Sequence, residues 1–323
     1  ALHGAVILNY ATVAEEDNDG GGPMYYIGEG LKGAAADRIP DVVILTEGTG
    51  GSGEGALGIY RGQRGRMQIE VEVTGKSCHG SMPWEGRNPL EYGGAIVAEA
   101  AERYLLGEGF ADDPFLGAGS RTASWAQLET PSDCAVPERF TFRLDRRLTA
   151  GEDPEQARCD VEALPTVERA RRNGLSVEVR IPVYENLTWK GYRPGNAQVY
   201  PGWVTPEEHP SITAAVDTYR SAVTPMAQLT ESGALQNDPR VARWVFSTDG
   251  VGVPLPSAMA EIEVPASKRW IDQPPYHHPA MFGIGPGFEQ NTHKIGECVD
   301  TRELAPVIAF YARFPSVFRG SKS

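Results

Sequence analysis

The sequence predicts an α/β domain with a mostly parallel sheet, into which an α+β domain with an open antiparallel sheet is inserted. Short apolar runs near both ends of the chain, such as DVVILTE and WVFSTDG, are typical of strands that helices cover on both faces. In the middle of the chain, GRMQIEVEVTG alternates apolar and polar residues, which is typical of antiparallel strands with one exposed face. A length of 323 residues also favours two domains.

The outer α/β domain begins with two predicted strands, AVILNYATV at 5–13 and DVVILTE at 41–47. The segment between them contains YYIGEGLKGAAADR, a candidate crossover helix. Later in the chain, a capping box from Thr205 to Glu208 predicts the start of a helix. WVFSTDG and AMFGIGPG return to the buried-strand pattern, and TRELAPVIAFYARFPSVF predicts a closing amphipathic helix.

The inserted α+β domain covers residues from about 64 to about 188. Its predicted strands are the alternating segments GRMQIEVEVTG, RFTFRLDRRL and LSVEVRIPVY. Two predicted helices lie among them, and the second begins at Asp153 and ends at Gly174, as helix capping requires. The outer domain is therefore discontinuous and consists of residues 1–63 and 189–323.

Charge and hydropathy exclude several classes of partner. The formal net charge is −13, and an acidic chain gains no counterion release on a phosphate backbone, so we expect no nucleic-acid partner. No apolar run approaches the about 20 residues that span a bilayer, and the first residues lack the basic start of a signal peptide. The four cysteines form no CxxC pair, which favours reduced thiols. We therefore expect a cytoplasmic protein that acts on a small molecule.

Acidic residues crowd directly after the first predicted strand. VAEEDNDGGG brings four of them, beginning with Glu15 and Glu16, within five positions, where their charges repel one another. Glu47 ends the next predicted strand, and His293 follows the glycine loop of GIGPGFEQNTHKIGE. Ligands of open α/β sheets gather at the carboxyl ends of the strands, and a histidine with carboxylates suits zinc, manganese or cobalt. The residues thus predict either a cation site or, as the alternative, a solvated acidic loop.

Other ligand-binding motifs lack a required residue. An EF-hand loop with Gly20 at its sixth position would need a glutamate where the chain has Tyr26. GTGGSG matches the dinucleotide-binding pattern, but a strand pattern follows where a helix is required. A phosphate-binding loop that ends at Lys76 would need a glycine at Glu70. A pair of glycosidase carboxylates remains open, but it would not account for His293.

The chain resembles the dinuclear zinc family of aminoacylase, carboxypeptidase G and succinyl-diaminopimelate desuccinylase. The resemblance rests on segments in the same order: EED, VILTEGT, GRMQIEVEVTGKSCHGSMPWEGRNP, CAVPERFTFRLDRR and GIGPGFEQNTHKIGE. It implies a zinc-peptidase-like catalytic domain and an inserted lid and dimerisation domain, and hence a homodimer. Within the family, YRGQRGRM and LDRRLT look most like the YgeY-type hydrolases linked to selenium metabolism.

The resemblance implies two divalent metal ions, zinc or alternatively manganese or cobalt, and a role for each matching acid. Glu15 would be the general base that takes a proton from a metal-bridging water. Glu16 would bind one ion together with His293, and Glu47 would bind the other. Asp249, in the turn STDG, is left outside the predicted metal site.

The resemblance also implies residues that contact the substrate. His79, in GKSCHGS of the lid, would stabilise the tetrahedral intermediate in the neighbouring subunit's site. Arg147 would hold a substrate carboxylate, and the backbone around Gly285 and Gly287 would help to orient it. The alternatives are that His79 caps a turn and that Arg147 forms a surface ion pair.

One expected segment is missing from the pattern. Family members carry an HxD motif and a bridging aspartate before the acidic pair, and these supply two of the five expected metal ligands. The resemblance therefore implies an N-terminally truncated chain. The sequence predicts a metal-dependent hydrolase of a C–N bond in a small carboxylate-bearing substrate. The rival hypothesis is a non-catalytic relative or inactive fragment that acts through dimerisation or ligand binding.

Overall fold

The computed structural model of the chain describes residues 6–50, 57–229, 238–256 and 262–320. The chain divides into two compact units, of which the first comprises residues 1–63 and 203–323 and the second residues 64–202. The second unit continues beyond the predicted end at 188, because strand β11 (Val199–Tyr200) pairs with strand β3 (Gly65–Thr74).

The first unit combines short strands with helices at both ends of its sequence. Its elements in chain order are α1 (Glu15–Asn18), α2 (Gly21–Tyr25), η1 (Tyr26–Gly30), β1 (Val42–Leu45), β2 (Ile59–Gln63), β12 (Trp203–Val204), α6 (Pro210–Thr218), η3 (Tyr219–Val223), α7 (Thr224–Leu229), β13 (Val241–Trp244), η4 (Asp249–Gly252), β14 (Leu255–Pro256), η5 (Ala266–Lys268), β15 (Ile271–Gln273), β16 (Tyr276–His278), β17 (Ala280–Gly283), η6 (Glu289–Asn291), η7 (Thr301–Glu303) and α8 (Leu304–Gly320).

The main sheet of the first unit has the order β1-β17-β2-β12, and β13 also pairs with β2. The pairs β1–β17 and β13–β2 are parallel, whereas β17–β2 and β12–β2 are antiparallel. The fold class is confirmed, but the sheet is mixed where a mostly parallel sheet was predicted. The reason lies partly in the insertion: the chain leaves this unit after β2 and re-enters it at β12, and neighbouring strands that lead out and back run in opposite directions.

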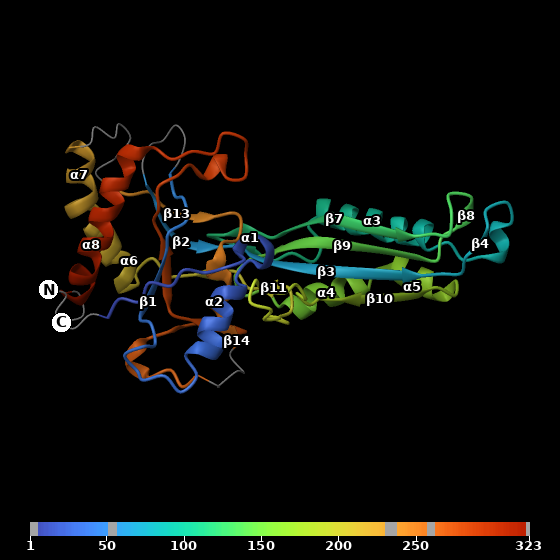
Figure 1. The fold of residues 1–323 in the computed structure, drawn as a ribbon, viewed down its shortest axis with the longest axis horizontal. Helices are drawn as coiled ribbons and strands as arrows, with labels where there is room; N and C mark the ends of the chain where they lie inside the picture. The colour runs from blue at the N-terminus through green and yellow to red at the C-terminus, as the bar shows by residue number, and fades with distance from the viewer. Residues whose placement is uncertain (1–5, 51–56, 230–237, 257–261, 321–323) are drawn as a thin grey trace. The chain divides into compact units, whose positions relative to one another are not determined.

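Apolar side chains cover both faces of this sheet. On one face, Phe282 of β17 packs against α6, η3 and α8 in a core that includes Tyr219 and Phe310. On the other face, Trp203 and Trp244 pack with residues of η1 and of the segment after η4. Figure 1 shows α6, α7 and α8 along one side of the strands and α2 along the other. A sheet covered on both faces explains why its strands are short apolar runs.

Three sequence predictions about this unit need correction. Residues 6–13 form no strand, and Val6, Ile7 and Leu8 are exposed, because the run has no ladder partner among the described strands. The predicted crossover helix is shorter and ends at Gly30 as the turn η1. The helix predicted from Thr205 begins instead at Pro210, where the side chain of His209 accepts from the amide of Ser211 as N-cap.

The second unit is an open sheet with helices on one face. Its elements are β3, β4 (Cys78–His79), η2 (Pro83–Glu85), α3 (Pro89–Leu105), β5 (Asp112–Asp113), β6 (Gly117–Ala118), β7 (Ser120–Glu129), β8 (Ala135–Val136), β9 (Arg139–Leu148), α4 (Pro154–Glu162), α5 (Pro165–Arg172), β10 (Ser176–Arg180) and β11. Its sheet has the order β10-β3-β9-β7 with all pairs antiparallel, as the alternation predicts.

Alternation along β3 separates a buried face from a charged face. Met67, Ile69, Val71 and Val73 lie in the core with residues of α3, α4 and α5. On the opposite face, Glu70 forms ion pairs with arginines of the neighbouring strands, at 2.7 Å from Arg143 and 2.6 Å from Arg180. Figure 1 shows the long strands β3 and β9 side by side and the helices along them.

Two further findings concern the whole chain. All four cysteines are free, as the scattered spacing predicts. Within the described ranges, no helix combines the length and the apolar character that crossing a bilayer requires.

Candidate metal centre

The carboxyl ends of β1 and β17 carry two loops that run side by side. The parallel pairing of Leu45 with Gly283 continues beyond the strands, since the amide of Thr49 donates to the carbonyl of Gly285 at 3.0 Å and that of Gly50 to the carbonyl of Gly287 at 2.8 Å. A Cβ atom on Gly285 would lie 2.2 Å from a backbone oxygen of Thr46, so only glycine permits this approach. The loop that bears Glu47 therefore lies against the predicted substrate-orienting glycines.

Glu16 and His293 are brought together in the first unit. His293 Nε2 lies 3.1 Å from Glu16 Oε2, and the two side chains are 70% and 75% exposed. The His293 amide donates to Glu297 Oε2 at 3.1 Å. An exposed ion pair contributes little to stability by itself. Its significance is chemical, because imidazole and carboxylate are ligands that zinc prefers.

Glu15 and Glu47 belong to the same acidic group. Burial, and then the carboxylates of Glu16, Asp19, Glu47 and Asp249, raise the pKa of Glu15 to about 7. The pKa of Glu47 is also raised, first by burial and then by Asp249 and Glu16 among its neighbours, although the Gly48 amide lowers it. The acids that crowd together in the sequence thus repel one another in the fold as well, and a cation among them would relieve that repulsion.

Asp249 is a member of this group that the sequence analysis left out. Burial raises its pKa, while hydrogen bonds from the Thr12 hydroxyl and the Gly250 amide lower it. The Thr12 hydroxyl donates to Asp249 Oδ2 at 3.0 Å. The signal in the sequence was its place near the end of the predicted strand WVFSTDG, as Glu47 stands at the end of DVVILTE.

Strained backbone surrounds the acidic group. Of the non-glycine residues that the structure describes, those with positive φ are Ala14 (60°), Asp19 (41°), His293 (61°) and Arg269 (51°). Ala14 and Asp19 lie on either side of Glu15 and Glu16 in the sequence, and His293 is itself a predicted metal ligand. Such conformations cost about 1–3 kcal/mol each and persist where the surroundings hold them, which is common at functional sites.

The donor set fits a divalent cation in its chemistry, because it combines an imidazole with several mutually repelling carboxylates. In the arrangement that the described residues adopt, however, no three His, Cys, Asp or Glu side chains lie close enough together to hold one ion. The assembled element is the Glu16–His293 pair, and the roles of Glu15, Glu16, Glu47 and His293 stay predictions.

His79 and Arg147 lie in the second unit. His79 is exposed at the end of β4, and its Nδ1 accepts the amide of Ser81 at 3.1 Å, which is the turn-capping contact of the alternative interpretation. Arg147, on β9, is half-buried, and its Nε donates to Asp145 Oδ1 at 2.8 Å. These contacts leave the predicted substrate roles of both residues as predictions.

Comparisons with known proteins agree with the fold. Residues 61–171 match the model of a peptidase dimerisation domain. The chain is 32% identical over 310 residues to the protein described as "Uncharacterized protein YgeY" of Escherichia coli K12, a match that covers 96% of this chain and 64% of YgeY. The chain therefore spans less than two thirds of the length of this relative.

Two solved structures with a similar fold are described as peptidases. A tripeptidase of Staphylococcus aureus superposes with a TM-score of 0.54 at 14% identity, covering 95% of this chain and 63% of that one. An M20 family metallo-carboxypeptidase of Sulfolobus solfataricus gives a TM-score of 0.54 at 14% identity, covering 91% and 66%. The chain carries the dimerisation domain of the M20 peptidases and shares the fold of a metallo-carboxypeptidase of that family, in agreement with the resemblance of its sequence.

Proposed function

We propose that this chain contributes the acidic centre of a metal-dependent hydrolase that cleaves a C–N bond, amide or peptide-like, in a small substrate with a carboxylate. The observation that carries the proposal is the Glu16–His293 pair, 3.1 Å apart, in which the Glu16 carboxylate also contributes to the raised pKa of Glu47, the acid that follows β1. Because the chain spans 64% of the length of YgeY, activity, substrate and partner are all proposals.

The proposed cofactors are two divalent ions, zinc or alternatively manganese or cobalt. When bound, they would supply an activated water molecule and polarise the scissile carbonyl. Glu16 and His293 would hold one ion and Glu47 the other. Glu15 would take up a proton from that water and return it to the leaving nitrogen as the general base.

Four further residues are proposed to contact the substrate. Arg147 would hold the substrate carboxylate by its planar guanidinium, for which Asp145 is the present partner at 2.8 Å. Backbone amides around Gly285 and Gly287 would orient the substrate beside Glu47. His79, as an exposed side chain, would donate a hydrogen bond to the oxyanion.

The test combines metal analysis with one isosteric substitution. The protein should hold stoichiometric zinc and hydrolyse members of a panel of N-acylated amino acids and dipeptides. Glu15→Gln should retain the metal and lose at least about 100-fold in kcat, because the base is removed and the ligands remain. Asp17→Asn, which removes a negative charge two residues after Glu15, should leave the metal content and kcat unchanged. Full activity of Glu15→Gln would refute the role of Glu15.

The second candidate function is that of a non-catalytic relative that acts through dimerisation. It is favoured by the absence, in the described ranges, of any three side chains arranged to hold an ion. A metal-free protein that hydrolyses no member of the panel but still dimerises would support this candidate over the first.

The proposed dimer contact is the edge strand β7 of the second unit. Residues 122–129 of this strand are exposed, including Trp125 at 43% and Leu128 at 39%. β7 ends the sheet order, and an unpaired edge of this length invites a further strand. The matched dimerisation domain contains this strand, so the proposed partner is a second copy of the chain.

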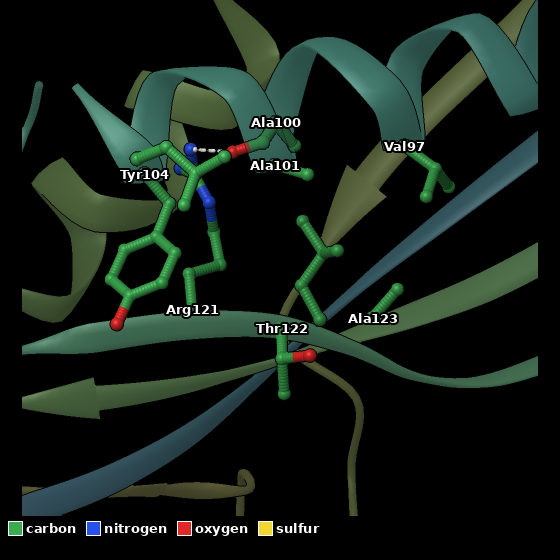
Figure 2. A pocket seen from close by; sticks show the side chains of 9 residues that line it. Val97, Ala100, Ala101, Tyr104, Arg121, Thr122 and Ala123 are labelled. Atoms are coloured by element: carbon green, nitrogen blue, oxygen red, sulfur yellow. Dashed lines mark hydrogen bonds between the residues drawn. The ribbon is translucent and has the colours of Figure 1, made fainter. Parts of the chain in front are cut away.

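A pocket beside β7 adds a place for an apolar side chain of that second copy. It has a volume of about 220 Å³ and lies between α3 and β7. Figure 2 shows Val97, Ala101 and Tyr104 of the helix opposite Thr122 and Ala123 of the strand. Leu105, which also lines it, is 82% exposed. An apolar hollow at an unpaired edge is a feature that dimerisation would cover.

A further inference from the structure

Tyr60, Arg240 and Glu289, from three separate segments, form a hydrogen-bonded network, called here the Tyr60 network, that contacts the loops of the candidate metal centre. Tyr60, on β2, is fully buried, and its hydroxyl donates to Glu289 Oε2 at 2.7 Å. Arg240 Nη2 donates to the same hydroxyl at 2.5 Å, and its guanidinium lies 5.1 Å from the centroid of the Tyr60 ring. The Tyr60 network thus links a guanidinium cation to a carboxylate through a buried hydroxyl.

The hydrogen bonds of the Tyr60 network are strong, which makes the network rigid. Burial first, and then the neighbouring Glu289, raise the pKa of Tyr60, so its hydroxyl stays protonated and can donate. Hydrogen bonds to an ionised partner are roughly twice as strong as neutral ones, and a buried setting strengthens them further. Trp244 also packs against Tyr60, with ring centroids 5.1 Å apart.

The Tyr60 network is connected to the two loops that follow β1 and β17. Arg240 Nη2 donates to the carbonyl of Thr49 at 3.3 Å, two residues from Glu47. The amide of Glu289 donates to the carbonyl of Gly50 at 3.1 Å. Glu289 is therefore held through its backbone by one loop and through its side chain by Tyr60.

The segment after Glu289 leads directly to His293. Glu289 begins the turn η6, which ends at Asn291. His293 then has a φ of 61°, a conformation that a histidine keeps only where neighbouring structure imposes it. A fixed point at Glu289 is such a constraint, because it lies at the start of the turn that delivers the strained residue.

We infer that Glu289, anchored by Tyr60 and Arg240, is a positioning residue that fixes the turn presenting His293 to Glu16. The inference rests on the proposed function, in which His293 is a metal ligand, and extends the site to three residues that touch neither substrate nor metal. Partners of this kind that orient a ligand commonly change metal affinity 10–100-fold when removed.

The test measures Zn²⁺ affinity by competition with a chromophoric chelator, and hydrogen exchange of the segment 284–293. Tyr60→Phe and Glu289→Ala should each weaken Zn²⁺ binding at least about 10-fold and speed exchange in this segment. The Zn²⁺ affinity of the double variant should be no lower than that of the single variant that binds Zn²⁺ more weakly, because both substitutions break the same Tyr60 network. Glu289→Gln, which keeps an acceptor oxygen, should recover most of the affinity.

Tyr219→Phe is the matched control. Tyr219 is equally buried, and its hydroxyl has no hydrogen-bond partner among the described residues, so neither measurement should change. Wild-type affinity and exchange in Tyr60→Phe and Glu289→Ala would overturn the inference and leave the proposed function standing. Zn²⁺ binding by the wild type no tighter than by His293→Asn would overturn both.

Discussion

Glu15, Glu47 and Asp249 each carry a carboxyl group with a raised pKa, and burial is the first cause in every case. Burying several carboxylates together costs free energy unless a cation or protons accompany them. At the scale of single residues, this cost is the physical reason to expect a ligand at the acidic group. Structural ion pairs would place arginine or lysine there, as they do around Glu70 on the sheet of the second unit.

A buried histidine away from the site gives a pH-dependent prediction. His278 is fully buried, and burial, the first cause, lowers its pKa to about 4. Between pH 6.5 and 4 the unfolded chain therefore binds a proton that the folded chain excludes. The free energy of unfolding should fall through this window by up to about 3 kcal/mol, and the loss should be complete below pH 4.

Denaturant unfolding at a series of pH values measures this loss. His278→Gln should lack the corresponding part of the pH dependence, whereas His79→Gln, a change at an exposed position, should keep it. A slope between pH 6.5 and 4 that is the same in His278→Gln and the wild type would contradict the account.

Some site residues follow from the sequence and others do not. The family resemblance implied the pairing of Glu16 with His293, and the structure places the two side chains 3.1 Å apart. The participation of Asp249 was not expected, because a TDG turn is equally compatible with a surface loop. Its contact with Thr12 joins residues 237 positions apart in the chain, which no local pattern encodes.

At the scale of elements, burial decided which predictions held. The alternating strands β3 and β9 were predicted well, because one covered face imposes a period of two on the sequence. The run at 6–13 has the same apolar character as β1 but lies exposed, because strand formation also needs a neighbour that composition does not reveal. The second predicted helix of the insertion divides into α4 and α5, since Pro165 interrupts the ladder.

The close approach of the two strand-end loops predicts the effect of added methyl groups. In Gly285→Ala, the new Cβ would meet the Thr46 carbonyl at 2.2 Å, so the loops must separate. We expect a loss of about 2 kcal/mol or more in stability together with weaker Zn²⁺ binding. Gly94→Ala is the control, because this helical position has nothing within 4 Å and alanine should stabilise it by about 0.5–1 kcal/mol. Equal stability of the two variants would contradict the described loop contact.

The edge strand β7 predicts the effect of charge on assembly. Leu128→Lys should convert the proposed dimer to a monomer, because a lysine on an edge strand opposes the addition of a further strand. Leu187→Lys, at an exposed leucine of the same unit outside any strand, should leave the dimer intact. Sedimentation velocity distinguishes the two states. A Leu128→Lys protein that remains dimeric would place the contact elsewhere.

At the scale of the whole molecule, the change from buried runs to alternating strands predicted an insertion at about 64–188, and the matched dimerisation domain at 61–171 overlaps most of that region. The end of the second unit at Gly202 could not be read from the sequence, because β11 follows a long irregular stretch and joins the sheet through a pairing of only two residues. A net charge of −13 is a bulk property, but part of it is concentrated where a cation is proposed.

The central claim is that Glu16, Glu47 and His293, distant in sequence, share divalent ions at the edge where β1 and β17 end. Anomalous scattering from crystals of the protein grown with Zn²⁺ tests it most directly. We expect a zinc peak about 2.0–2.2 Å from both His293 Nε2 and a carboxylate oxygen of Glu16. A carboxylate oxygen of Glu47 should lie at the same distance from a second, neighbouring zinc peak. Zinc bound only at other residues, or no peak within reach of His293, would contradict it.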